Sequence, residues 1–448
     1  MPIMAASSGC RRTYTGGKMK PQVQDFLERH MLDADQISMD SLCDMFISEM
    51  KAGLAGKPSS LAMIPSFCSP DARPKAGEAV LVIDAGGTNF RTCLVTFDKS
   101  LNPVISDFRK SSMPGIKKEV GAAEFFSTIA DEAERLIDRS DRIGFCFSYA
   151  AQILPDHDGI PQFFSKEIKA PEVIGKHLGK ELLAEFARRG HDVSKKKVII
   201  LNDTVTTLLA AKADSHAASY DGCIGFILGT GTNTAYIEKA SNITKVDPSV
   251  FGSEYQIINV ESGCLDISLG DIDREFLAGT NQPDNYKLEK MISGAYLGPL
   301  AFHVISHAVD EGLFSKAFGD AFSKLAGLAT HELSAFLGGD EECTLSCCAK
   351  DEDDYDTLME LMGSFIARAA KLTAANLASA VLITDFGKDE DHPVLINADG
   401  TTFHKTAFLR SYTTEYLDAF LAEKGRRAVI TQIENSPTIG SAVGALTL

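Results

Sequence analysis

A buried strand that ends in an acidic residue and two glycines is the feature that most constrains this chain. Residues 80–83 are all apolar, which is typical of a strand covered on both faces, and Asp84 follows them directly. Gly86 and Gly87 allow a tight turn and a close approach of main-chain N–H groups to a ligand, which a Cβ atom would block. The apolar run 93–97 then predicts a returning strand. We expect a hairpin whose tip holds phosphate oxygens, although an ordinary Gly-Gly hairpin also fits these residues.

Polar side chains next to this turn suit a phosphorylated ligand. Asp84 stands at the end of the strand, where it is placed to bind a divalent ion through water. Thr88 and Asn89 add a hydroxyl and an amide, and Arg91 adds a positive charge. These groups favour phosphate binding over a plain hairpin.

A second glycine-rich turn occurs near the middle of the chain. An apolar run from Ile224 enters a turn formed by Gly229, Thr230, Gly231 and Thr232, and an apolar segment follows at 235–237. Alone, this unit fits a hairpin without a ligand. Two such loops in one chain instead suggest two halves that hold one polyphosphate from opposite sides. Neither loop has the G-x-x-x-x-G-K-S/T or the G-x-G-x-x-G pattern.

The composition describes a soluble globular protein. At 448 residues the chain is long for one hydrophobic core, which predicts two domains. A net charge of −17 argues against nucleic acid or an anionic membrane as a partner, since phosphate groups would be repelled. The ten cysteines form no C-x-x-C pair, so a reduced, cytoplasmic chain is expected. We find no run of about 18 apolar residues and expect no transmembrane helix.

Apolar periodicity predicts that a β-β-β-α-β-α-β-α order in the first half begins again near residue 221. Predicted strands comprise three within 79–108 and single strands at 143–147, 198–201, 223–228, 234–238, 256–260, 394–397 and 429–433. Predicted helices comprise two within 21–55, then 122–138, 171–189, 204–213, several from 285 onward, 355–380 and a closing helix of small residues from 440.

Asp203 is the candidate for proton transfer. It leaves the predicted strand 198–201 at the start of a helix, where the helix dipole favours its ionised form. A carboxylate in this position can accept a proton from a substrate hydroxyl. The segment Asn202, Asp203 and Thr204 also contains three good N-cap residues, so Asp203 as a simple helix cap is an equal alternative.

Five further segments and the two loops together resemble the hexokinase family, within the superfamily of sugar kinases, actin and heat-shock ATPases. The five segments are 144–149, 164–166, 201–205, 259–263 and 288–298, and they occur in the order found in that family. The resemblance covers the chain from about residue 77 to its end. It implies an α/β, two-lobed actin-like ATPase fold with duplicated ribonuclease H-like domains and an interlobe cleft.

The resemblance also implies a division into lobes. The small lobe is expected to contain residues 77–207 and 436–448, with the first phosphate loop and Asp203. The large lobe is expected to contain residues 21–76 and 208–435, with the second loop and the adenosine site. Residues 1–20 are expected to form a disordered tail.

Residue by residue, the resemblance assigns a sugar site and a catalytic pair. It makes Asp203 the general base, and Lys166 a catalytic residue that faces the transferring phosphoryl group. The implied hexose ligands are Ser148, Ser165, Lys166, Asn202, Asp203, Asn233, Glu261 and Glu289. Gly440 and Ser441 begin the closing helix, which the resemblance brings close to adenosine, whereas small residues there also suit simple packing of the helix against a sheet.

The implied activity is phosphorylation of a hexose, with glucose favoured, at its 6-hydroxyl by ATP and Mg²⁺, as in glycolysis. A cytoplasmic monomer or homodimer is expected, with no nucleic-acid or membrane partner. The alternatives are a sugar-binding regulator with weak turnover and an actin-like or chaperone ATPase. The chain has Tyr149, Ala150 and Ser262 where the family usually has phenylalanine, proline and tryptophan, which puts the sugar preference in doubt.

Overall fold

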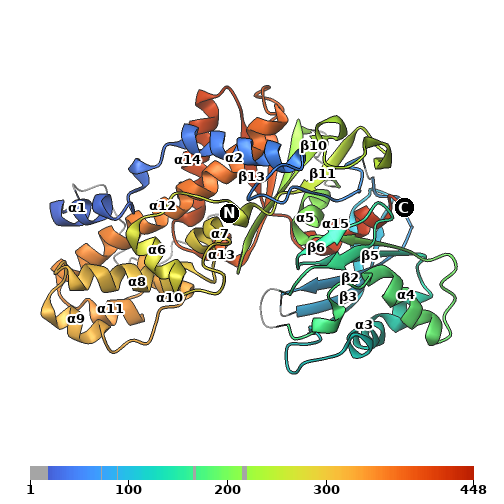
Figure 1. The fold of residues 1–448 in the computed structure, drawn as a ribbon, viewed down its shortest axis with the longest axis horizontal. Coiled ribbons are helices and arrows are strands. Elements are labelled where there is room, and N and C mark those ends of the chain that lie inside the picture. The colour runs from blue at the N-terminus through green and yellow to red at the C-terminus, as the bar shows by residue number, and fades with distance from the viewer. Residues whose placement is uncertain (1–18, 72, 88, 165–167, 214–218) are drawn as a thin grey trace, which may run out of the picture.

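Two lobes, each with its own β-sheet, make up the protein (Figure 1). The computed structural model describes residues 19–71, 73–87, 89–164, 168–213 and 219–448. One lobe contains a five-stranded sheet with two helices on its outer face. The other contains a six-stranded sheet and most of the helices.

The small-lobe sheet has the strand order β4-β3-β2-β5-β8. Its first three strands form the expected antiparallel meander, and β5 and β8 add to it in parallel. The bounds are β2 Val80–Gly86, β3 Asn89–Phe97, β4 Pro103–Ser112, β5 Arg142–Phe147 and β8 Lys197–Leu201. Side chains of α3 (Ala122–Ile137) and α4 (Leu178–Arg188) pack on one face of this sheet. The helix predicted at 171–189 begins later because Gly175 has a φ of 80°.

The large-lobe sheet repeats this arrangement. Its order is β1-β11-β10-β9-β12-β13. The antiparallel meander β9 to β11 is again extended by two parallel strands, β12 and β13, and β1 adds antiparallel to β11 at the other edge. The bounds are β1 Ile64–Pro65, β9 Gly222–Leu228, β10 Thr232–Lys239, β11 Tyr255–Asn259, β12 Val394–Asp399 and β13 Ala428–Thr431. The repeated topology confirms the predicted duplication of an α/β unit.

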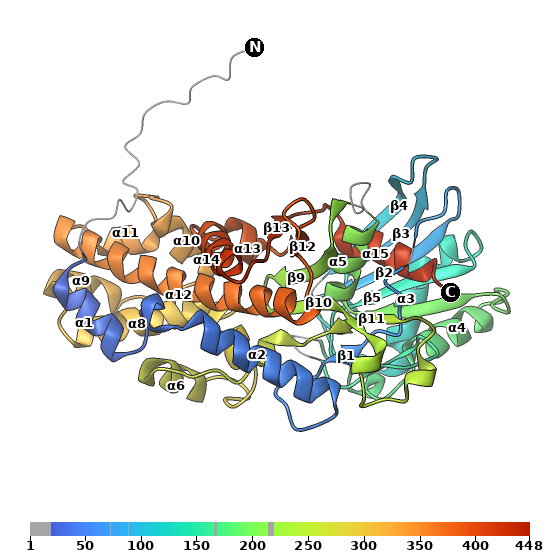
Figure 2. The same ribbon diagram turned by 90° about the horizontal axis from the view of Figure 1, so that it is seen from above.

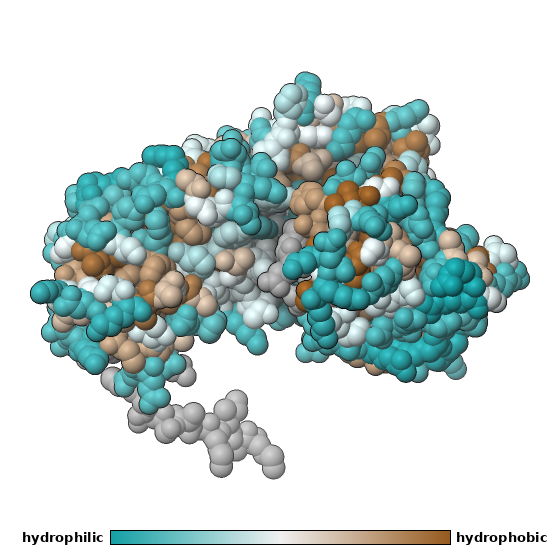
Figure 3. Space-filling view, turned by 60° about the horizontal axis from the view of Figure 1, so that its bottom comes forward, coloured by the Kyte–Doolittle hydropathy of each residue, from teal (hydrophilic) through white to brown (hydrophobic). Residues whose placement is uncertain are grey.

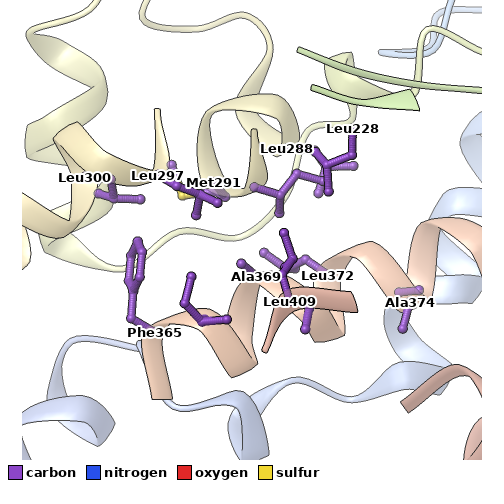
Figure 4. Packing of buried hydrophobic residues seen from close by; sticks show 14 of the residues in the cluster. Leu228, Leu288, Met291, Leu297, Leu300, Phe365, Ala369, Leu372, Ala374 and Leu409 are labelled. Carbon is purple, nitrogen blue, oxygen red and sulfur yellow. The ribbon is translucent and has the colours of Figure 1, made fainter. Parts of the chain in front are cut away.

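Helix α12 (Glu352–Thr384) is the central helix of the large lobe. It runs along that lobe beside α2 (Met39–Leu54), as Figure 2 shows. Figure 4 shows Leu288 and Met291 facing Phe365 and Ala369 of α12. These side chains belong to one buried cluster that also includes α1 (Pro21–Arg29), α7 (Lys287–Ile292) and α8 (Leu297–Asp310).

The same helix is long and apolar enough to cross a membrane by length and composition alone. Most of its apolar window is buried inside the protein, however, as expected for a core helix.

The remaining α-helices and β-strands of the described chain are β6 Ala151–Ile153, β7 Gly159–Pro161, α6 Asp271–Ala278, α9 Lys316–Phe322, α10 Thr330–Leu337, α11 Thr344–Cys348, α13 Thr401–Lys405 and α14 Leu409–Glu423.

Two helices, α5 (Asp203–Lys212) and α15 (Ser436–Ala445), join the lobes. They pack against each other inside a cluster of buried apolar side chains that includes residues of both sheets. A Cβ atom on Gly440 would lie 1.8 Å from the carbonyl oxygen of Thr206, and one on Gly144 would lie 2.2 Å from that of Ser441. Gly440 and Ser441 are buried and serve close packing, and their contact with adenosine stays a prediction.

Candidate active site

The first phosphate loop is the turn between β2 and β3. Gly86 pairs with Asn89 across the hairpin, and Gly87 has a φ of 37°, in the region that favours glycine. The hydroxyl of buried Tyr149 donates a hydrogen bond to the carbonyl oxygen of Gly87. The turn is therefore a hairpin, as predicted, and Tyr149, two residues after the end of β5, supports it. Thr88 lies outside the described residues.

Asp84 and Arg91 stand directly opposite each other on β2 and β3. They form an ion pair with 2.5 Å between Nη1 of Arg91 and Oδ2 of Asp84. Burial raises the pKa of Asp84, while the Arg91 charge opposes that rise and the carboxylate of Asp203 adds to it. Arg91, expected to contact the nucleotide, thus neutralises Asp84 in this conformation. The carboxylate of Asp203 adds a second negative charge near Asp84, which Arg91 alone does not balance.

The carbonyl groups of the second candidate phosphate loop accept hydrogen bonds from neighbouring segments of the large lobe. The carbonyl of Gly229 accepts hydrogen bonds from the Gly294 N–H at 2.8 Å and the Thr402 hydroxyl at 2.8 Å. The Ala295 N–H donates to the carbonyl of Thr230 at 3.1 Å. Within the turn, the Gly229 N–H donates to the Gly231 carbonyl at 2.9 Å and the Thr232 hydroxyl donates to the Ile227 carbonyl at 2.9 Å. The loop is therefore fixed by its own hydrogen bonds as well as by its neighbours.

The turn after β12 packs closely against this loop. Gly400 has a φ of 116°, and a Cβ atom there would lie 2.3 Å from the carbonyl oxygen of Leu228. Any other residue at this position would push the turn away from the loop. The Asp-Gly-Thr turn of the sequence therefore supports the second phosphate loop.

Asn202, rather than Asp203, is the N-cap residue of α5. Its side-chain oxygen accepts a hydrogen bond from the Thr204 N–H at 2.9 Å. Asp203 occupies the first helical position, and its carboxylate accepts a hydrogen bond from the Thr204 hydroxyl at 3.3 Å. Asn202 thus fills the capping role that was the alternative for Asp203.

A chain of polar side chains runs along the large-lobe edge of the site. The amide of Asn233 donates to Oδ1 of Asn259 at 2.7 Å, and the amide of Asn259 donates to Oε1 of Glu261 at 2.8 Å. Glu261 has a φ of 57°, which is uncommon outside glycine. Burial raises its pKa to about 7, and the charges of Asp203 and Glu289 add to the rise.

Glu289 lies beside the second phosphate loop. Its Oε2 accepts a hydrogen bond from the Thr232 N–H at 3.0 Å, and a Cβ atom on Gly231 would lie 2.5 Å from that oxygen. The ammonium group of Lys290 instead donates to the carbonyls of Asn281 and Gln282. Both side chains thus make hydrogen bonds to main-chain groups.

The described residues that the sequence assigned to a sugar site come from both lobes and lie near the junction of the lobes. Ser148 follows β5, with its N–H bonded to the carbonyl of Ala85 at 3.1 Å, close to the first loop. Asp203 is near enough to affect the pKa of Glu261 in the other lobe. Figure 3 shows a hollow between the lobes. Ser165 and Lys166, the other expected sugar ligands, lie outside the described residues.

Sequence reasoning missed two residues of the site. Asn259 bridges Asn233 and Glu261, and Tyr149 supports the first loop. Asn259 lies two residues before Glu261 at a strand end, so the period of a β-strand could have identified it. The hydroxyl of Tyr149 gave no such signal, because its partner is a main-chain carbonyl distant in sequence.

Comparison with known proteins gives a consistent result. One model of the hexokinase family matches residues 22–213, and a second hexokinase model matches residues 223–447. Hexokinase-3 from Homo sapiens is 28% identical over 426 residues, which cover 89% of this chain and 44% of that protein. Hexokinase-7 from Oryza sativa subsp. japonica is 28% identical over 442 residues, covering 91% and 92% of the two chains. The chain thus spans less than half the length of the human relative.

Solved structures show the same fold. A hexokinase from Schistosoma mansoni complexed with glucose superimposes with a TM-score of 0.74 at 23% sequence identity. The match covers 95% of this chain and 99% of the Schistosoma chain. At this identity the likeness concerns the fold, which is the two-lobed sugar-kinase fold expected from the sequence.

Proposed function

Because this chain belongs to the hexokinase family, we propose that it transfers the γ-phosphoryl group of ATP to the 6-hydroxyl of a hexose, with glucose as the favoured substrate. The observation that carries the proposal is the position of Asp203. It begins α5 where the two lobes meet, while Asn202 caps the helix. The helix cap therefore does not depend on the Asp203 carboxylate, which acts electrostatically on Asp84 of one lobe and Glu261 of the other.

In the proposed reaction, Asp203 accepts the proton of the 6-hydroxyl as that oxygen attacks the γ-phosphorus. The bond between the γ-phosphorus and its bridging oxygen breaks, and ADP leaves with the electron pair. The proton then passes from Asp203 to solvent. The N-terminal end of α5 favours the ionised carboxylate before the transfer.

The loops would hold the nucleotide from two sides. Gly87 and Asn89 of the first loop and Thr230 and Gly231 of the second would supply N–H, amide and hydroxyl donors for phosphate oxygens. Mg²⁺, when bound, would neutralise charge on these oxygens. Asp84 would hold the Mg²⁺ ion through water. The nearby carboxylate of Asp203 adds negative charge that would favour a cation at this position.

The hexose would be oriented by donors and acceptors of both lobes. Each sugar hydroxyl needs a donor and an acceptor, and this requirement suits a set of amides, carboxylates and one serine. The Asn233–Asn259–Glu261 chain fixes the rotamers of its members before the sugar arrives. The proposed ligands among the described residues are Ser148, Asn202, Asp203, Asn233, Glu261 and Glu289.

A coupled assay of ADP release, with and without glucose, tests the proposal. Glucose-dependent ADP release with a sugar 6-phosphate as the product would support it. Glucose binding by calorimetry without turnover would make the protein a sugar-binding regulator instead. ADP release that does not depend on any hexose would indicate an ATPase of the same superfamily and would overturn the proposal.

A further inference from the structure

Two histidines of α8 face one carboxylate of α6, away from the phosphate loops. His303 and His307 are four residues apart, so they lie one above the other on the same side of the helix. Their Nε2 atoms lie 3.6 and 3.2 Å from the two carboxylate oxygens of Glu275 on α6. The two imidazole rings have centroids 5.1 Å apart. The site joins two helices that lie close together in the large lobe (Figure 1).

The spacing of these three groups suits a metal ion. Each residue offers one ligand atom, and these atoms all lie within 4.8 Å of one another. In a tetrahedral zinc site with bonds of about 2.0–2.1 Å, ligand atoms are about 3.3 Å apart. The two measured histidine-to-carboxylate distances are already close to that value. Small rotations of the exposed Glu275 and of the rings would complete the geometry.

One of the three candidate metal-binding atoms makes no hydrogen bond to the described residues. The Nε2 atom of His303 is buried and makes no hydrogen bond there, since 3.6 Å to Glu275 is too long for one. A buried polar atom without a partner costs free energy. A bound cation would remove this cost, whereas a plain ion pair at this distance does not.

We propose that Glu275, His303 and His307 form a binding site for a divalent transition-metal ion, best suited to zinc. Two imidazoles and one carboxylate are typical zinc ligands and leave a fourth position for water. Mg²⁺ prefers oxygen ligands in octahedral geometry, so this site differs in chemistry from one that serves Mg²⁺ and ATP. The proposal does not depend on the proposed function.

The surroundings hold the ligands in place. The ring of Phe276 lies 6.1 Å from that of His303, and His30 lies 6.4 Å from His307. His30 is itself fixed between the carboxylates of Asp271 and Glu311.

Metal binding would connect α6 to the helix that supports the second phosphate loop. Helix α8 begins shortly after Gly294 and Ala295, whose N–H groups bond to the loop carbonyls. An ion that binds only the folded protein also stabilises it by mass action. We therefore expect Zn²⁺ to raise the melting temperature of the full chain.

The test is a titration of the tag-free, metal-stripped protein with Zn²⁺ by calorimetry and with Co²⁺ by visible absorption. We expect one ion per chain at this site, with the absorption of tetrahedral Co²⁺ and no competition from excess Mg²⁺. His303→Ala and His307→Ala should each weaken Zn²⁺ binding by at least about 10-fold. Loss of a residue that only orients a ligand already costs about 10–100-fold in metal affinity, so loss of a direct ligand should cost no less. Glu275→Gln, at an exposed position, should weaken it without affecting folding.

The control is His392→Ala. His392 is an exposed histidine paired with Asp389 at 2.7 Å, a single histidine–carboxylate pair, and its loss should leave Zn²⁺ affinity unchanged. Absence of Zn²⁺ and Co²⁺ binding to the wild-type protein would overturn the proposal. So would unchanged affinity in Glu275→Gln and both histidine variants, particularly if Cys347→Ser then removed the binding, because the ion would be bound by thiols instead.

Discussion

The carboxylate of Glu289 accepts a hydrogen bond from the main-chain N–H of Thr232 at 3.0 Å. This contact connects a proposed hexose ligand to the second phosphate loop. A Cβ atom at position 231 would lie 2.5 Å from the same carboxylate, so a larger residue there would displace the Glu289 side chain. The proposed sugar site and the proposed phosphate loop therefore meet at this contact.

We predict that Glu289→Gln impairs hexose recognition. The amide keeps the size of the side chain but removes the charge, and hydrogen bonds to charged groups contribute about 1.5–3 kcal/mol. The value of kcat/KM for glucose should fall by about 10-fold or more. Glu238→Gln is the matched control, because Glu238 is a buried glutamate of the same lobe that bonds to Tyr236 and Asn242. An equal loss in both variants would contradict a specific role for Glu289.

Tyr149→Phe should loosen the first phosphate loop. The substitution removes only the hydroxyl that donates to the Gly87 carbonyl. A hydrogen bond of this kind contributes about 0.5–1.5 kcal/mol. We expect KM for ATP to rise by about 2- to 10-fold in steady-state kinetics. An unchanged KM for ATP would show that the tyrosine hydroxyl does not support nucleotide binding.

The sequence predicted the fold well where a pattern spans many residues. The meander of β2 to β4, the long helix α12 and the repeated sheet follow from long apolar runs and their periods. The strand β1 has only two residues, one of them Pro65, and is defined by its pairing with β11. Pairing with a distant strand leaves no local signal, which explains why this strand was missed.

In the candidate site, too, some features had a sequence signal and others did not. The glycine loops and the carboxylates were identified from motifs, whereas the cap could not be assigned, since Asn202, Asp203 and Thr204 all have good capping side chains. Gly440 and Ser441 illustrate the reverse case. Small residues at these two positions suit both a bound adenosine and close packing. The structure shows the packing of Gly440 against Thr206 of α5, and the adenosine contact stays a prediction.

The pKa of Glu261 predicts how stability depends on pH. Burial raises this pKa from 4.5 to about 7, so the folded protein binds the proton more tightly than the unfolded chain does. The resulting contribution to the free energy of unfolding is fully present below pH 4.5 and is lost as pH rises to about 7. Denaturant unfolding should therefore show wild type losing stability relative to Glu261→Gln over this range. A pH-independent difference would contradict the raised pKa.

Hexose binding should close the two lobes. The proposed ligands include Asn202 on one side of the junction and Asn233 and Glu261 on the other, so one sugar can satisfy all of them only if the lobes approach. We expect saturating glucose to lower the radius of gyration in small-angle scattering. A non-binding sugar alcohol is the control. An unchanged radius with glucose bound would argue against a hinge.

The central claim is that Asp203 is the general base, and Asp203→Ala tests it most directly. Loss of a general base costs about 10²–10⁴-fold in kcat. The melting temperature should change little, because Asn202 provides the helix cap. Asn202→Ala gives the contrast, since loss of the cap should cost about 1 kcal/mol of stability.

The decisive measurement is kcat of Asp203→Ala per folded molecule, recorded alongside a thermal melt of the same sample. Our account predicts a kcat lowered by at least about 100-fold, with ATP binding retained and a melting temperature close to that of wild type. A near-normal kcat combined with a lowered melting temperature would contradict it and would make Asp203 a structural residue of α5.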